Sequence, residues 1–100
     1  MALSIQQSQE YLGKGRWSCS VWIDGEARDL DTIDHVTYIL DPTFHNPVRT
    51  VTDRATNFRL DTSSWGKFTL HAVVNHRDGS ETRLHHDLVL VYPDGTPTLA

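Results

Sequence analysis

Residues 66–92 read GKFTLHAVVNHRDGSETRLHHDLVLVY, and this stretch decides the fold because it holds two runs of alternating apolar residues. An apolar residue at every second position is typical of a strand with one buried face. Asp78-Gly79 lies between the runs and is a turn signal, so the stretch predicts an antiparallel β-hairpin. The residues expected on its buried face are Phe68, Leu70, Ala72 and Val74 in the first strand, and Leu84, Leu88 and Leu90 in the second.

The parity of the buried positions fixes the register of this hairpin. Residues that pair directly lie on one face of a sheet, so an even-numbered residue must face an even-numbered one. A two-residue loop would pair Arg77 with Ser80 and put one apolar set on the wrong face. A three-residue loop, Arg77-Asp78-Gly79, pairs His76 with Ser80 and puts Gly79 where a left-handed backbone is needed. We therefore predict the three-residue loop.

A group of histidines follows from this register. His71 lies opposite His85 on the face away from the core, with Asp87 diagonal to His71, whereas His86 faces the core. Imidazole and carboxylate groups are ligands that zinc accepts. The group matches no recognised ligand motif, however, and paired exposed residues on a sandwich face are usually solvated. We therefore predict no metal site and no cofactor.

Further runs with the same alternation lie upstream. Residues 17–24, 33–40 and 56–60 predict strands, and residues 3–11 predict a weaker one, with turn-forming pairs between them. Many short strands at this spacing predict an all-β fold, an antiparallel two-sheet β-sandwich with almost no helix. The core residues expected from these runs are Trp17, Cys19, Val21 and Ile23, then Val36, Tyr38 and Leu40, then Phe58 and Leu60.

Length and composition limit the class of protein. A chain of 100 residues fits a single domain spanning residues 1–100. The net charge of −4 and the scattered Lys and Arg argue against direct nucleic-acid binding, which usually needs a basic patch. One cysteine, Cys19, cannot form a disulfide within the chain or a Cys-based zinc site. No run is long enough to span a membrane and the first residues lack signal-peptide order, so we expect a cytoplasmic protein.

Two motifs resemble the YEATS domain family. The first is residues 38–51, YILDPTFHNPVRTV, which is similar to the family's Leu-His-x-Ser-Phe-x-x-Pro segment. The second is residues 63–68, SSWGKF, which is similar to its segment of small residue, aromatic residue, Gly or Ala, any residue, Phe. WIDG at residues 22–25 and the pair Asp87-Leu88 match in the same order, so the resemblance covers about residues 17–92. It is closer to the prokaryotic members, and it implies an immunoglobulin-like sandwich with a ligand cleft formed by loops at one end.

The resemblance also implies roles for individual residues. Members that act on chromatin bind acylated lysine and hold its flat acyl amide between aromatic rings, which Phe44 and Trp65 would supply here. Thr43 takes the place of the family's serine hydroxyl. The backbone N–H of Trp65, in the same ligand-binding segment as Gly66, would face the acyl carbonyl. Asp87 matches an acidic residue near the cleft.

Two positions depart from the family pattern. Asp41 stands in the ligand-binding loop where the family has a histidine. We expect its carboxylate to approach Asp87, so that the two either repel each other or share a proton. The first loop has Gly15 or Trp17 where chromatin readers present a further aromatic residue, and Trp17 is a candidate substitute.

These observations predict a binding module that does not catalyse a reaction, with a protein or peptide partner that includes an acylated lysine. A second hypothesis is a protein-interaction module with a vestigial cleft, in which Phe44 and Trp65 only close the end of the core. A third is a metal-dependent enzyme that uses the surface histidines. Catalysis is disfavoured because the sequence has no nucleophile elbow and no phosphate-binding glycine loop.

Overall fold

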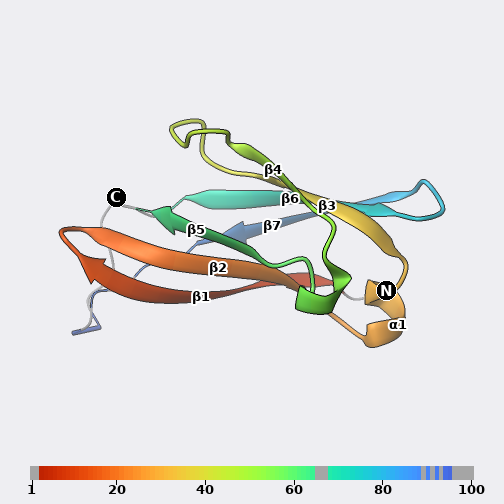
Figure 1. Cartoon of the computed structure of the whole chain (residues 1–100), viewed down its shortest axis with the longest axis horizontal. Coiled ribbons are helices and arrows are strands. Elements are labelled where there is room, and N and C mark those ends of the chain that lie inside the picture. The colour runs from red at the N-terminus through yellow and green to blue at the C-terminus, as the bar shows by residue number, and fades with distance from the viewer. Residues whose placement is uncertain (1–2, 65–67, 89, 91, 93, 96–100) are drawn as a thin grey trace.

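The chain folds into two antiparallel β-sheets packed face to face (Figure 1). The computed structural model describes residues 3–64, 68–88, 90, 92 and 94–95. Sheet A has the order β1-β2-β5 and contains β1 (Ser4–Gly13), β2 (Arg16–Asp24) and β5 (Leu60–Ser64). Sheet B has the order β4-β3-β6-β7 and contains β4 (Val48–Val51), β3 (Ile33–Ile39), β6 (Thr69–His76) and β7 (Glu81–Asp87). The predicted two-sheet sandwich is confirmed.

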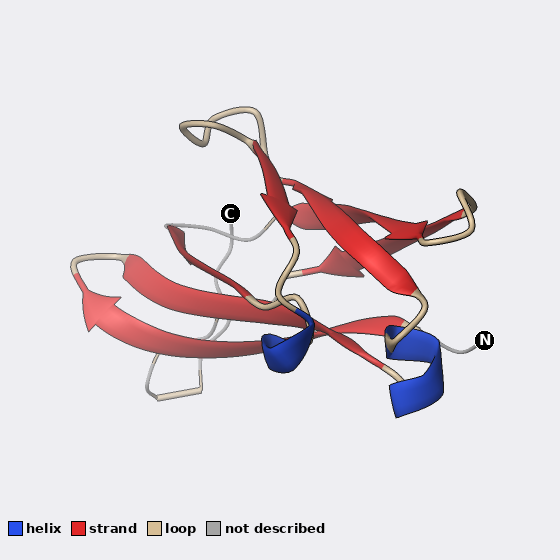
Figure 2. Cartoon of the chain, turned by 45° about the vertical axis from the view of Figure 1, so that its right-hand side comes forward, coloured by secondary structure: helices blue, strands red, loops and turns tan. Residues whose placement is uncertain are grey.

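The connections between the sheets contain two short helical segments, which Figure 2 shows in blue. They are α1 (Ala27–Leu30), between β2 and β3, and the 3-10 helix η1 (Arg54–Thr56), between β4 and β5. No helix in the described part of the chain is long and apolar enough to cross a membrane. Sequence analysis did not predict β4, whose four residues are too few to show a clear alternation.

The strand predicted over residues 56–60 is wrong. The Asp53 carboxylate accepts a hydrogen bond from Ala55 N at 3.1 Å and starts the 3-10 turn instead. Asn57 and Phe58 then adopt left-handed backbone, with φ of 57° and 59°. A strand cannot pass through two such residues, so β5 begins only at Leu60.

The core lies between the sheets and is built from the alternating residues. Every predicted core residue that the structure describes is buried except for three that are half-buried, Leu60, Phe68 and Leu84. Tyr38 has no exposed surface, and its hydroxyl donates to the Phe58 carbonyl oxygen at 2.6 Å. Burial raises the pKa of Tyr38 above its ordinary value. The phenol therefore stays protonated and ties β3 to the turn before β5.

The predicted register of the β6–β7 hairpin is confirmed. His71 pairs with His85, and His76 N donates to Ser80 O at 2.9 Å across the three-residue loop. Gly79 has a φ of 90°, in the left-handed region. His86 faces inward as expected, and its Nε2 is hydrogen-bonded to Gln7 of β1. This bond joins the two sheets along one side of the sandwich.

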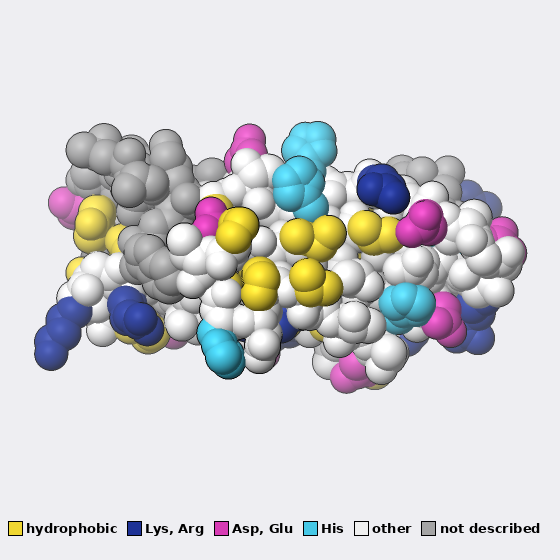
Figure 3. All heavy atoms as spheres, turned by 90° about the horizontal axis from the view of Figure 1, so that it is seen from above, with side chains coloured by type: hydrophobic (Ala, Val, Ile, Leu, Met, Phe, Trp, Pro, Cys, Tyr) yellow, Lys and Arg dark blue, Asp and Glu magenta, His cyan; other side chains and the backbone are white. Residues whose placement is uncertain are grey.

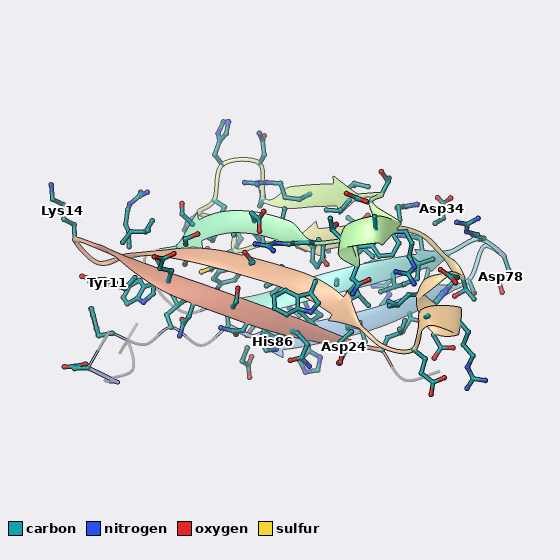
Figure 4. All side chains as sticks on the ribbon, turned by 60° about the horizontal axis from the view of Figure 1, so that its bottom comes forward. Tyr11, Lys14, Asp24, Asp34, Asp78 and His86 are labelled. Carbon is teal, nitrogen blue, oxygen red and sulfur yellow. The ribbon has the colours of Figure 1, made fainter. Side chains whose placement is uncertain are left out.

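The loops gather at two opposite ends of the molecule. In Figure 4, Tyr11 and Lys14 mark the end with the β1–β2 turn, and Asp34 and Asp78 mark the other. Trp17, just after that turn, pairs with Ser64 at the end of β5. Figure 1 shows the β3–β4 loop on the same side of the molecule. We call this side the cleft end.

Candidate ligand-binding site

A compact loop, residues 41–47, connects β3 to β4 at the cleft end. Asp41 Oδ1 accepts hydrogen bonds from Thr43 N at 2.9 Å and from Thr43 Oγ1 at 2.8 Å. Phe44 N donates to Asp41 O at 3.0 Å, which closes a turn of the kind that Asp favours as its first residue. Leu40 N donates to Pro47 O at 2.7 Å and joins the two ends of the loop. The loop therefore has a defined shape before any ligand arrives.

The far side of the same loop is held by Arg49. Its guanidinium donates from Nε to the Asn46 carbonyl and from an Nη to the His45 carbonyl at 2.9 Å. Asn46 has a φ of 53°, a left-handed conformation that asparagine tolerates. Sequence analysis did not predict this role, because a single arginine in a strand carries no signal of where its side chain turns.

Phe44 lies at the rim of the core. Its ring is half-buried and packs on Phe68, with centroids 5.1 Å apart and planes tilted by 58°. Tilted aromatic pairs at this spacing are favourable. The contact places the Asp41–Thr43 turn beside the first residues of β6, which directly follow the SSWGKF motif. The loop therefore contacts Phe68, the last residue of that motif.

Two predicted ligand-binding residues, Trp65 and Gly66, lie outside the described residues. The residues on either side of that segment are placed: Ser64 is buried opposite Trp17, and Phe68 contacts Phe44. The roles predicted for the Trp65 ring and its backbone N–H stay predictions.

The structure does not show the expected approach of Asp41 to Asp87. The strand order puts β6 between β3 and β7, and each carboxylate has its own hydroxyl donor. Thr69 Oγ1 donates to Asp87 Oδ1 at 2.9 Å, whereas Asp41 is bonded to Thr43. The Thr43 backbone N–H and then its hydroxyl hold the pKa of Asp41 below its usual range.

Trp17 does not substitute for the family's additional aromatic wall, so that expectation is wrong. Only 1% of Trp17 is exposed, because its ring lies 4.9 Å from that of Tyr11 and 5.0 Å from that of Tyr92. The Tyr11 and Tyr92 rings also touch, at 5.4 Å. The position of Tyr11 was readable from the sequence, since it follows the buried Ile5 by an even number of residues.

The histidine pair lies where the register predicted. His71 and His85 are exposed on the outer face of sheet B, with ring centroids 6.4 Å apart. Asp87 is hydrogen-bonded to Thr69. No group of three or more possible ligands close enough for a metal ion occurs among the described residues. The absence of a metal site remains a prediction.

Fold and loop together define an immunoglobulin-like sandwich with a structured loop at one end. A family model described as the prokaryotic YEATS domain matches residues 17–89. The chain therefore belongs to the prokaryotic YEATS domain family. YEATS domains are non-catalytic reader modules, so a binding module that is not an enzyme is consistent with the family.

The chain is also similar to individual eukaryotic proteins. Transcription initiation factor TFIID subunit 14 of Schizosaccharomyces pombe is 40% identical over 65 residues, which are 64% of this chain and 26% of that protein. The chain thus matches only about a quarter of the length of that relative.

Solved structures of Yaf9 share the fold. The Yaf9 YEATS domain bound to H3K27ac superimposes with a TM-score of 0.69 at 18% identity, covering 96% of this chain and 75% of that one. The yeast AF-9 homolog protein Yaf9 gives 0.69 at 17% identity, covering 92% and 66%. The Yaf9 YEATS domain recognising an H3K122suc peptide gives 0.66 at 18% identity, covering 96% and 72%.

Proposed function

We propose that this domain binds a protein or peptide partner through an acylated lysine, whose acyl amide enters the cleft end between Phe44 and Trp65. The observation that carries the proposal is the packing of Phe44 on Phe68, 5.1 Å away. This contact anchors Phe44 on Phe68, which is three residues after Trp65 in the sequence. The acyl groups on the H3 peptides of the Yaf9 structures supply the ligand class.

The hydrogen bonds of Thr43 suggest how one half of an acyl amide is recognised. An amide has an N–H donor and a carbonyl acceptor, and burial of either without a partner is costly. The Thr43 hydroxyl donates its proton to Asp41 and so presents lone pairs to a ligand. In this proposal, Thr43 accepts the N–H of the lysine amide, and the backbone N–H of Trp65 donates to its carbonyl.

Asp41 acts here as a positioning residue in place of the family histidine. Because Thr43 holds the pKa of Asp41 below its usual range, the carboxylate is ionised at neutral pH and keeps both hydrogen bonds to Thr43. Asp41→Ala should weaken ligand binding through loss of this orientation. Asp41→His should retain binding or strengthen it, since it restores the residue that the family uses.

The test is a titration of the purified domain with acetylated, crotonylated, succinylated and unmodified lysine peptides. Trp65→Ala should abolish binding, since stacking on an aromatic ring contributes ~1–3 kcal/mol. Trp22→Ala is the matched control, because Trp22 is half-buried on the part of β2 that is remote from Ser64. If neither the native chain nor Asp41→His binds any acylated peptide, the proposal is wrong, and a protein-interaction module with a vestigial cleft takes its place.

A further inference from the structure

Strand β4 is an edge of sheet B, and its register shows which backbone groups face outward. Leu40 N donates to Pro47 O at 2.7 Å, so Leu40 and Pro47 form a hydrogen-bonded pair. In an antiparallel ladder, such pairs alternate with pairs whose backbone groups point away from each other. The pairs Ile39–Val48 and Thr37–Thr50 are therefore of the second kind. The N–H and C=O groups of Val48 and Thr50 consequently point to the free edge.

This edge is short, at four residues, but within the strand it has no proline and no bulge to block pairing. Natural edge strands commonly carry charged side chains, prolines or bulges that block another strand. Val48 and its partner Ile39 are uncharged and 59% and 38% exposed, and Thr50 is exposed and uncharged as well. The only charged residue of β4, Arg49, is turned back onto the loop carbonyls. Within the described ranges, no strand pairs with the outer side of β4.

The outer face of sheet B beside this edge is partly apolar. Figure 3 looks onto this face and shows hydrophobic side chains gathered in its middle, with histidine side chains beside them. The register places Val48, Ile39, His71 and His85 in one row across the sheet. A strand added to β4 would extend this row, and its side chain opposite Val48 would cover exposed apolar surface.

The edge is continuous with the candidate ligand-binding site. β4 begins directly after the loop that carries Thr43 and Phe44, and Val48 is four residues from Phe44 in the sequence. An extended peptide advances about 3.3 Å per residue. A peptide whose modified lysine contacts Phe44 therefore reaches Val48 and Thr50 within a few residues.

We propose that β4 binds the segment flanking the acylated lysine as an added antiparallel or parallel strand, through the backbone groups of Val48 and Thr50. The preferred flanking residue opposite Val48 is apolar or β-branched and uncharged. The inference rests on the proposed function, because the same peptide supplies the lysine. Backbone pairing gives affinity with little sequence dependence, and the Val48 position gives selectivity.

The test compares two probes: the small compound Nα-acetyl-Nε-acetyl-lysine methylamide, and a peptide with a central acetyl-lysine and about six alternating Val and Thr residues on each side, a reach of about 20 Å per arm. The long peptide should bind at least about ten-fold more tightly. Thr50→Pro removes an outward N–H and leaves the β3–β4 hydrogen bonds intact, which edge strands tolerate. This substitution should weaken the affinity for the long peptide about 3- to 10-fold, as expected for the loss of one hydrogen bond. The affinity for the small compound should stay the same.

Thr50→Val is the matched control, because it changes the side chain and keeps the N–H; its affinity for the long peptide should match that of the native chain. Two peptides, each N-methylated at one of the two alternating sets of flanking amides, test the same bonds without altering the protein. The peptide whose methylated amides face β4 should bind more weakly than the other. If the domain binds both probes with equal affinity, the proposed strand addition is wrong, whereas the proposed acyl-lysine binding still holds. Failure of both probes to bind would overturn both proposals. If the native chain forms a dimer that Thr50→Pro dissociates, a second copy of the chain occupies the β4 edge. That result would overturn the proposal that a peptide binds there.

Discussion

Tyr38→Phe tests whether one buried hydroxyl stabilises the crossover between the sheets. The Tyr38 hydroxyl donates to Phe58 O at 2.6 Å, and both residues have no exposed surface. Phenylalanine fills the same space, so the cost is that of a buried carbonyl left without this donor, about 1–3 kcal/mol. For a domain of this size, about 2 kcal/mol lowers Tm by roughly 8–16 °C. The assay is denaturant and thermal unfolding followed by circular dichroism.

Tyr11→Phe is the matched control for this prediction. The Tyr11 hydroxyl accepts from Gly15 N at 3.0 Å at the half-exposed β1–β2 turn, where water can replace it. Its loss should cost less than about 1 kcal/mol. A Tyr38→Phe variant as stable as the native chain, or only as destabilised as Tyr11→Phe, would refute the reasoning. Phe58 in left-handed backbone would then need another source of stabilisation.

Four further predictions follow from the described residues. Gly79→Val should lower the free energy of unfolding by about 1–2 kcal/mol, because φ is 90° there, and Gly79→Asn should cost less; equal denaturation midpoints would contradict this. Burial raises the pKa of Cys19 from 9.0 to about 11, so stability should fall as pH rises from 9 to 11, and Cys19→Ala should flatten that fall. Seryl hydroxyls lower the pKa of Asp61 and Asp78 from 3.8, so their contribution to stability is present above pH 3.8 and lost as pH falls further; Asp78→Asn should reduce this acid loss. Dialysis against zinc should leave no metal bound, and one zinc per chain that is lost in His71→Ala would contradict the predicted absence of a site.

The parts of the fold that sequence analysis predicted correctly depend on periodicity and parity. Buried positions such as Trp17 and Tyr38 follow from alternation, because a pleated strand presents every second residue to one face. Parity then sufficed to choose the loop that ends at Gly79. The strand expected around Phe58 failed because alternation cannot reveal a left-handed backbone at an aromatic residue.

The candidate site was less predictable than the fold. Motif resemblance placed Phe44 and Thr43 at the cleft end, but not the hydrogen bonds that give the loop its shape. Asp41 was expected to interact with Asp87, and it is bonded to the backbone and hydroxyl two residues away instead. Short polar side chains readily bond to nearby backbone groups, and a strand register does not report such local competition.

The strand order has a consequence for how fast the chain folds. Three pairings, β1–β2, β3–β4 and β6–β7, join consecutive strands, whereas β2–β5 and β3–β6 join strands that are distant in sequence. Hairpins form in about 1–10 μs, but folds dominated by non-local pairings usually need milliseconds to seconds. The chain leaves sheet B at Val51 and enters sheet A at Leu60, so neither sheet can be completed from one continuous stretch. The slow step is therefore expected to be the formation of the non-local pairings β2–β5 and β3–β6, with the hairpins formed beforehand.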